Sequence, residues 1–337
     1  MATRTVPLLP LADLVAGQEA DLFALLTSKE ELKTRDGKPY FRVGFRDDRR
    51  EVMVPIWSDS PFATPCRQEW TPGAFYKLRA VYRETSYGPQ LDIIKIRETC
   101  ERDAADGFDP TMFLPRSRFE PRAMYDELLA IAREKILDRE LSALVVSLYE
   151  THRDVLLRLP AATHNHHAFV GGYLEHVLSV TRTCVYLADK YAAYYPNLAP
   201  PLNKDLVIAG ALLHDIGKVR ELDERPEGAA YSAAGGLIGH ILQGRDMLRE
   251  ASAAHRLDPE VLLRLEHVII SHQRLPEWGS PKPPMTLEAL LVHFADDIDA
   301  KFHMMYAILR DDTTAGPLTS KKNVLMQKVY RGPATTK

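Results

Sequence analysis

Histidines and carboxylates with the spacing of metal ligands gather in the second half of the chain. Ten of the twelve histidines lie between residues 164 and 293. The run Ala211-Leu-Leu-His-Asp-Ile-Gly-Lys218 places an imidazole, a carboxylate and an ammonium group at the end of an apolar helical stretch, where burial costs free energy unless partners offset it. His214 and Asp215 lie about 100° apart on a helix and could converge on one cation, while Gly217 is expected to let the chain turn away. An isolated doublet would more simply be a helix-terminal ion pair, but the neighbouring histidines favour a metal site.

Further motifs surround this doublet on both sides. They are Asn165-His-His-Ala-Phe-Val-Gly-Gly-Tyr-Leu-Glu-His176, Leu213-His-Asp-Ile-Gly-Lys-Val219, Leu237-Ile-Gly-His240, Ile270-Ser-His272, Glu277-Trp-Gly-Ser-Pro281 and Asp299-Ala-Lys301. A histidine, a His-Asp doublet and a distant aspartate resemble the signature of the HD-domain phosphohydrolases. Together the motifs look like those of the YhaM-type 3′–5′ exoribonucleases, over roughly residues 15 to 315.

The resemblance implies two divalent ions per chain. It assigns the first ion to His176, His214, Asp215 and Asp296. It assigns the second to histidines among His240, His267 and His272. Because His267 and His272 are five residues apart, they do not share a helical face, and His272 with His240 is the preferred pair. Mixed imidazole and carboxylate ligands suit Mn²⁺, the preferred ion, with Mg²⁺, Fe²⁺ or Co²⁺ as alternatives. These histidines could instead be hydrogen-bonded structural residues, and Gln273 replaces a histidine often found at its position.

Other side chains near the motifs are candidates for catalysis and for positioning. Asp215 is expected to act both as a ligand and as a catalytic residue. Lys218 is expected to neutralise a phosphate oxygen, rather than close a helix in solvent. His166 and His167 could bind phosphate or protonate the leaving 3′-oxygen. Trp278 could stack on a terminal base or anchor its loop. Orienting partners for the ligand imidazoles are expected from Glu175, His293 and Asp299.

The composition is that of an ordinary globular protein, with 45% hydrophobic and 26% charged residues. No apolar run approaches 18 residues, and Pro7 and Pro10 interrupt the N-terminus, so neither a membrane span nor a signal peptide is expected. The three cysteines are scattered and form no Cys-x-x-Cys pair, which favours a cytoplasmic protein without a thiolate metal site. The net charge of −3 means that a nucleic acid must be held by a local groove or by metal ions.

The first hundred residues have the pattern of a small β-domain. Asp36-Gly37 predicts a hairpin, and Phe41, Val43 and Phe45 alternate with polar residues. Five short strands resemble an OB-type β-barrel that binds nucleic acid. Cations and aromatic rings interleave on these strands, which suits single-stranded nucleic acid, although a solvated barrel exterior would look similar. The residues expected to contact it are Tyr40, Arg42, Arg46, Lys77, Arg79 and Tyr82.

The chain is therefore expected to be a multidomain α and β protein. The expected parts are an OB-fold domain with its N-terminal lead-in at 1–98, a linker at 99–121, an all-α HD domain at 122–315 and a C-terminal tail at 316–337. Pro121 is expected to begin the first helix, where its missing N–H does no harm. Loops are expected at 195–204, 223–235 and 275–285.

The expected function is a metal-dependent 3′–5′ exoribonuclease that degrades single-stranded RNA, and single-stranded DNA as a further substrate, to 5′-mononucleotides. Direction and RNA preference come from the resemblance alone. One alternative is an HD phosphohydrolase of small or cyclic nucleotides with a structural barrel. Another is a non-catalytic, relaxase-like module that binds nucleic acid, although the intact ligand set argues against it. The oligomeric state, including a homo-oligomer, stays open.

Overall fold

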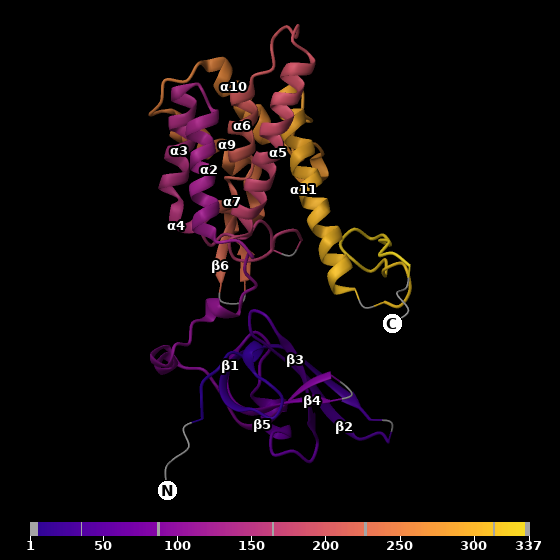
Figure 1. Ribbon diagram of the computed structural model, residues 1–337. Coiled ribbons are helices and arrows are strands. Elements are labelled where there is room, and N and C mark those ends of the chain that lie inside the picture. Colours follow the sequence, from indigo (N-terminus) through magenta and orange to yellow (C-terminus); the bar gives the residue numbers. More distant parts are fainter. Residues whose placement is uncertain are drawn as a thin grey trace. The chain divides into compact units, whose positions relative to one another are not determined.

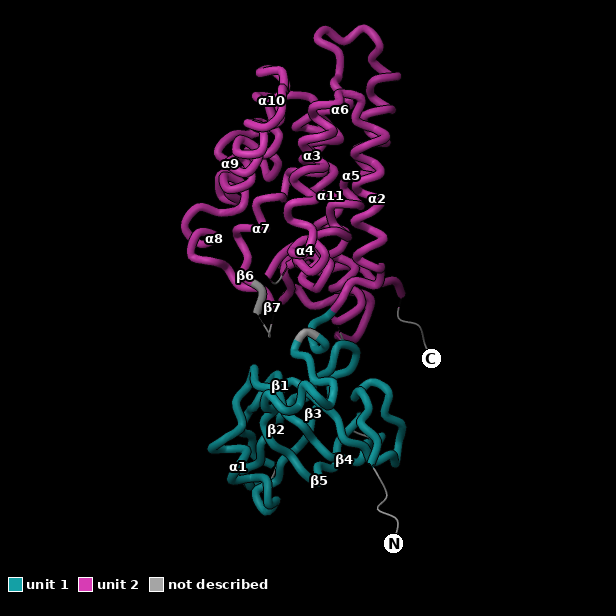
Figure 2. The backbone as a smooth tube through the Cα atoms, turned by 90° about the vertical axis from the view of Figure 1, so that its left-hand side faces the viewer, with its two compact units in different colours: residues 1–115 teal, residues 116–337 magenta. Residues whose placement is uncertain are grey.

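The computed structural model describes residues 6–34, 36–85, 88–163, 165–225, 228–312 and 314–333. His164, the first histidine of the run that ends at His167, lies outside these ranges. The chain divides into two compact units, residues 1–115 and residues 116–337 (Figure 2). Each unit has a hydrophobic core of its own.

The first unit is built on a five-stranded antiparallel sheet with the strand order β3-β2-β1-β4-β5 (Figure 1). The strands are β1 (Glu19–Lys33), β2 (Pro39–Arg46), β3 (Glu51–Trp57), β4 (Phe75–Thr85) and β5 (Gly88–Glu98). The long β1 pairs with both β2 and β4, and a bulge between Leu26 and Ser28 interrupts its register with β2. A closed barrel needs a ladder between its edge strands. Within the described residues no ladder joins β3 to β5, so the expected barrel is corrected to an open, OB-like sheet.

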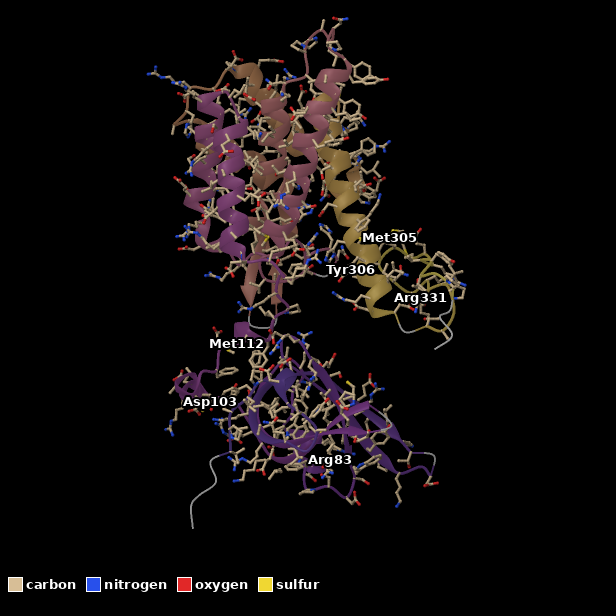
Figure 3. The ribbon with its side chains drawn as sticks, viewed as in Figure 1. Arg83, Asp103, Met112, Met305, Tyr306 and Arg331 are labelled. Atoms are coloured by element: carbon tan, nitrogen blue, oxygen red, sulfur yellow. The ribbon has the colours of Figure 1, made fainter. Side chains whose placement is uncertain are left out.

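The core of this unit follows the alternation of the strands. Phe41, Val43 and Phe45 are all buried, as predicted, while Arg42 between them is exposed. The short elements of this unit are η1 (Leu11–Asp13), α1 (Ala63–Gln68), η2 (Glu101–Asp106) and η3 (Pro110–Phe113). The last two lie in the segment that was expected to be a linker. Asp103, labelled in Figure 3, caps the N-terminal end of η2 by accepting a hydrogen bond from the backbone N–H of Cys100. Its carboxylate also accepts hydrogen bonds from the Arg97 guanidinium at 2.6 and 2.7 Å.

The second unit is mainly helical. Its helices are α2 (Pro121–Lys135), α3 (Arg139–Thr151), α4 (Arg153–Leu156), α5 (Gly172–Tyr194), α6 (Lys204–Leu213), α7 (Lys218–Glu221), α8 (Ala233–Ile238), α9 (His240–Ser252), α10 (Pro259–Ser271), η4 (Pro276–Trp278) and α11 (Leu287–Asp311). The prediction that Pro121 begins a helix is confirmed. One detail differs from the expected all-α domain, because β6 (Leu222–Arg225) and β7 (Gly228–Tyr231) form a two-stranded sheet. Four-residue strands are too short to leave a clear alternation in the sequence.

Helix α6 lies at the centre of this unit. It packs against α5, α10 and α11, and every residue from Leu206 to Leu213 is buried. A helix that is apolar on all sides is stable only when it is surrounded, so its sequence dictates this position. Asn203 caps its N-terminus through the backbone N–H of Leu206. The His-Asp doublet that follows its last turn is thereby carried into the interior.

Helix α11 is long, and its last turns run on beyond the neighbouring helices (Figure 1). Met305 and Tyr306 lie on this part and are partly exposed (Figure 3). The segment that follows folds back through an isolated bridge between Leu318 and Tyr330, and Arg331 forms an ion pair with Asp312. Among the residues that the structure describes, no helix is both long and apolar enough to cross a membrane.

Candidate metal centre

Five helices bring six of the seven predicted ligands to one place, all except His267. His176 comes from α5, and His214 and Asp215 follow the last turn of α6. His240 begins α9, His272 ends α10, and Asp296 lies in the middle of α11. The chain turns at residues 214–217, as expected, but Gly217 has an ordinary helical φ of −63°, so the turn does not depend on the backbone freedom of glycine. Gly217 is needed for close packing, because a Cβ there would lie 1.9 Å from the carbonyl oxygen of His240.

Four imidazoles turn their Nε2 atoms towards the two oxygens of Asp215. The Nε2 atoms of His176 and His214 lie 3.6 and 3.5 Å from Asp215 Oδ2. Those of His240 and His272 lie 3.3 and 3.6 Å from Asp215 Oδ1. Asp215 is therefore shared between two groups of nitrogen donors, one for each carboxylate oxygen. Asp296 completes the first group, with its Oδ1 3.2 Å from His176 Nε2.

The opposite nitrogen of each ring is held by an acceptor. His176 Nδ1 lies 2.7 Å from Asp299 Oδ2, and His240 Nδ1 lies 2.9 Å from Glu221 Oε1. His214 and His272 place Nδ1 2.8 and 2.7 Å from backbone carbonyl oxygens one turn earlier in their own helices. A ring that donates through Nδ1–H presents a lone pair at Nε2. All four lone pairs are thus directed at Asp215, as in rings oriented for a metal by outer hydrogen bonds.

The residues present fit a pair of divalent cations. Asp215 Oδ1 and His272 Nε2 are buried and have no hydrogen-bond partner, which is costly unless a ligand satisfies them. His176 Nε2 lies 3.3 Å from His214 Nε2, and both atoms offer lone pairs when the two rings are neutral. Donors that share one ion at about 2.1 Å lie roughly 3.0–3.4 Å apart. Mixed nitrogen and oxygen donors of this kind suit Mn²⁺, Fe²⁺ and Co²⁺.

Burial and neighbouring carboxylates shift the pKa values of His214 and His176 in opposite directions. Complete burial disfavours the imidazolium form of His214 and lowers its pKa to about 4. His176 is equally buried, but its hydrogen bonds to Asp296 and Asp299 outweigh that cost and raise its pKa to about 9. His176 therefore takes up a proton between these carboxylates when no other cation balances them.

Lys218 lies inside the centre rather than at its surface. Its side chain is 6% exposed, with Nζ 2.8 Å from Asp215 Oδ2 and donating to the carbonyl oxygen of Ala161. Burial opposes the charged form of Asp215, yet Lys218 and the imidazoles hold the pKa of this carboxyl well below its usual value. The expectation that Lys218 contacts a substrate phosphate stays a prediction, because Asp215 and Ala161 engage two of the three donors of its ammonium group. Its geometry suits the positioning of Asp215.

His166 and His167 lie beside His176, on the segment that precedes α5. The rings of His166 and His176 have centroids 5.1 Å apart, and burial lowers the pKa of His166 to about 2. His167 Nε2 lies 3.0 Å from Asp299 Oδ2, the same oxygen that holds His176. These three residues, His167, His176 and Asp299, also form a compact donor group. We assign His167 to orientation of Asp299, because both contacts converge on that oxygen.

The structure shows which of His267 and His272 faces the candidate metal centre. His272 reaches Asp215, whereas His267 is half-buried and its Nε2 accepts a hydrogen bond from the Met285 backbone N–H at 2.8 Å. The inclusion of His267 among candidate metal ligands is therefore corrected.

The orienting residues also differ from expectation. Glu221 was missed, although it stands three residues after Lys218 and a carboxylate one turn further along a short helix could have suggested it. His293 places Nδ1 2.7 Å from the backbone oxygen of His272 and so supports that turn rather than a ligand ring. Glu175 accepts a hydrogen bond from Ser117 Oγ at 2.6 Å.

The predicted nucleic-acid contacts in the first unit divide into two groups. Tyr40 and Arg42 remain accessible, and the Tyr40 ring lies 5.0 Å from that of Trp57, which is 48% exposed. Arg46 is half-buried, with an Nε that lacks a partner.

The other three predicted contacts are already engaged. Arg79 forms a bidentate pair with Asp21 at 2.7 and 2.8 Å, and Lys77 is paired with Asp106. Tyr82 is 3% exposed in the core, so its expected role in base stacking is wrong. The alternation contained this signal, because Tyr82 shares its face of β4 with the buried Leu78 and Ala80.

Parts of the chain are similar to known proteins. One similar solved structure is the second OB-fold domain of replication protein A from Methanococcus maripaludis, at 14% identity over 27% of this chain and 93% of that chain, with a TM-score of 0.22. Another is asparaginyl-tRNA synthetase from Entamoeba histolytica in complex with asparaginyl-adenylate, at 10% identity over 46% of this chain and 37% of that chain, with a TM-score of 0.24. The HD domain family matches residues 173–301. The chain thus carries an HD domain at residues 173–301, which implies a metal-dependent phosphohydrolase.

Proposed function

We propose that this protein is a metal-dependent phosphodiesterase that removes nucleotides one at a time from the 3′ end of single-stranded RNA. Single-stranded DNA is expected to be a second substrate. The phosphohydrolase class is implied by the HD domain. The substrate and the direction are supported by the motifs between Asn165 and Lys301 and by the OB-like sheet that precedes them.

One observation carries the proposal, namely that each oxygen of Asp215 faces its own group of imidazole nitrogens. The first group, His176 and His214 together with Asp296, would hold one ion. The second group, His240 and His272, would hold the other. Paired divalent ions, when bound, stabilise the attacking and leaving oxygens of an in-line displacement at phosphorus. Asp215 would contribute one carboxylate oxygen to each ion.

The protein's own residues supply the preorganisation. Asp299 and Glu221 fix the rings of His176 and His240, so the donors need little rearrangement when they bind. Lys218 holds Asp215 and offsets one negative charge in a buried site. Donors that are fixed before the reaction stabilise charge in the transition state without a reorganisation cost.

Tyr40, Trp57 and Arg42 in the first unit support a single-stranded substrate. Tyr40 and Trp57 are cross-strand partners on β2 and β3, and Arg42 lies on the same face as Tyr40 two residues further along. Aromatic rings stack on bases of any sequence, and a neighbouring arginine offsets phosphate charge. This face would hold the strand between successive cleavages.

A second candidate is a phosphohydrolase of small or cyclic nucleotides. The engaged state of Arg79, Lys77 and Tyr82 favours it, because three of the six predicted contacts cannot reach a strand without breaking pairs or unpacking the core. The first unit would then be structural.

A single set of incubations separates the two candidates. The full-length protein with Mn²⁺ is given 5′-labelled RNA, 3′-labelled RNA and labelled mononucleotides, with Asp215→Asn as the inactive control. The proposal expects a progressively shortened ladder from the 5′-labelled strand and immediate release of labelled mononucleotide from the 3′-labelled one. Hydrolysis of mononucleotides alone would overturn it in favour of the second candidate.

The role of the first unit is tested with a double substitution, Tyr40→Ala with Arg42→Ala. It should weaken degradation of oligonucleotides of about a dozen residues by roughly 10-fold while hydrolysis of a dinucleotide stays near normal, because the additional bases of a longer strand are available for stacking there. Arg83→Ala is the matched control, because it removes an exposed arginine of β4 that is paired with Asp92 on β5 (Arg83 is labelled in Figure 3). Equal loss on long and short substrates would contradict the assignment.

A further inference from the structure

The ligands of the candidate metal centre are not all equally buried. The ligand side chains on its inner wall, His176, His214, Asp215 and His272, are no more than 3% exposed. His240 and Asp296 are the exceptions, with side chains 12% and 14% exposed. These two more accessible ligands, His240 and Asp296, are called the opening of the centre.

The loop that carries Trp278 is fastened to the His240 end of this opening. Gln273 Nε2 lies 3.3 Å from His240 Nε2, and the Gln273 backbone N–H donates to Ser280 Oγ at 3.1 Å. Ser280 is fully buried, and the backbone N–H of Trp278 donates to Leu275 O at 3.0 Å. Gln273 and Ser280 thus hold the loop around Trp278 in place beside His240.

The same indole contacts α11, the helix that carries Asp296. Lys301 Nζ lies 5.8 Å from the centroid of the Trp278 ring, a cation–π contact. Lys301 is also paired at 2.7 Å with Asp297, the residue next to Asp296 on α11. Trp278 therefore lies on a loop that is tied to His240 through Gln273, and its ring contacts Lys301 on α11, the helix that also carries Asp296.

Trp278 is not packed as a loop anchor. Its side chain is 50% exposed, although burial of an indole is strongly favoured when a loop needs an anchor. Lys301 is 53% exposed, and an exposed lysine–aspartate pair contributes little to stability, so its ammonium group can exchange partners readily. An accessible ring beside an accessible cation matches the two parts of a nucleotide, the base and the phosphate.

We infer that Trp278 and Lys301 form a subsite for the terminal nucleotide of a single-stranded nucleic acid. The indole stacks on the base, and the Lys301 ammonium group contacts a phosphate of the same strand. The inference rests on the proposed function and names the residues that let this site distinguish a nucleotide from a bare phosphodiester. Stacking of one base on an indole changes affinity by between about 5- and 150-fold.

The test compares two oligoribonucleotides that differ only in their 3′-terminal residue, which is either a normal nucleotide or an abasic one. The wild-type, full-length protein should prefer the normal substrate in kcat/KM by at least about 5-fold, mainly through KM. Trp278→Ala should bring this preference close to one, and Trp278→Phe should restore most of it. Trp57→Ala, which removes an equally exposed indole from the first unit, should lower both substrates alike and keep the preference.

Lys301→Gln tests the phosphate contact. It should raise KM for both substrates by a similar factor and reduce the salt dependence of binding, because one phosphate contact is lost whatever the base. An unchanged preference in Trp278→Ala would overturn the stacking assignment. Loss of bound metal in that variant together with equal loss on both substrates would also overturn it, since Trp278 would then act only by positioning the loop at His240.

A binding measurement keeps the inference separate from the proposed function. Adenosine 5′-monophosphate should quench the indole fluorescence of the wild type more than that of Trp278→Phe, and ribose 5-phosphate should not. If the wild type degrades neither oligonucleotide but shows this quenching, the exoribonuclease proposal fails and the subsite stands. If the quenching is absent as well, the subsite is refuted.

Discussion

Replacement of Asp215 by asparagine is the most direct test of the centre. The amide has nearly the same shape as the carboxylate, so no cavity forms, but the charge shared by both donor groups is lost. Because each oxygen lies 3.3–3.6 Å from two imidazole nitrogens, both ions lose a ligand at once. We expect turnover to fall by at least about 10³, which corresponds to about 4 kcal/mol of transition-state stabilisation.

The same substitution leaves the buried ammonium group of Lys218 without its carboxylate partner. That pair is 2.8 Å long, with side chains 6% and 3% exposed. Breaking a buried pair costs about 3–5 kcal/mol, whereas removing both charges is often neutral. Asp215→Asn should therefore lower the free energy of unfolding of the metal-free protein, and Asp215→Asn with Lys218→Met should recover most of that loss without recovering activity.

The assay combines three measurements on each variant: turnover of 3′-labelled RNA with Mn²⁺, metal content after gel filtration, and denaturant unfolding in the presence of chelator. Asp189→Asn, which removes an exposed partner of Lys204, is the control and should resemble the wild type in all three. The reasoning is refuted if Asp215→Asn retains more than about a tenth of the turnover with unchanged metal content. Recovery of activity in the double variant would also refute it.

Three further predictions follow from neighbouring contacts. Gln273→His should raise the affinity for the second ion by about 10-fold in metal titrations, because an imidazole replaces an amide beside the second donor group; unchanged affinity would show that this position does not face the ion. Asp299→Asn should weaken binding of the first ion by about 10- to 100-fold, since His176 loses the acceptor that orients it, and equal metal affinity in calorimetry would contradict this. Asp103→Asn should cost about 1.5–3 kcal/mol at pH 7 by removing charged hydrogen bonds with Arg97. Because the Arg97 guanidinium holds the pKa of Asp103 well below its usual value, that stability is present above about pH 4 and is lost as the pH falls further, so wild type and variant should converge in acid unfolding curves.

Much of the architecture could be read from local patterns. The alternation around Val43 predicted the strand face that is buried, and Pro121 marked the start of α2. These features depend on periodicity and on backbone chemistry that each segment carries by itself. The two-stranded sheet of β6 and β7 was missed, because four residues carry too few alternations to be distinguished from a loop.

The candidate centre was predictable in residue type but not in role. Spacing allowed either His267 or His272 to face the centre, since five residues turn a helix by about 140°, and it could not say which. The spacing placed Lys218 on the metal side, but it could not identify both of its partners. The fold brings the carbonyl oxygen of Ala161, from a distant segment, to the ammonium group that Asp215 also holds.

The sequence by itself determined that α6 would be buried, because residues 206–213 leave the helix without a polar face. It follows that His214 and Asp215 would meet partners inside the protein. The sequence also determined which donor types were available there. Tertiary structure alone decided that four Nε2 atoms face the two oxygens of Asp215, because that arrangement depends on how α5, α9 and α10 cross α6 and α11. Helix crossings are set by the packing of side chains from distant segments, which no local periodicity records.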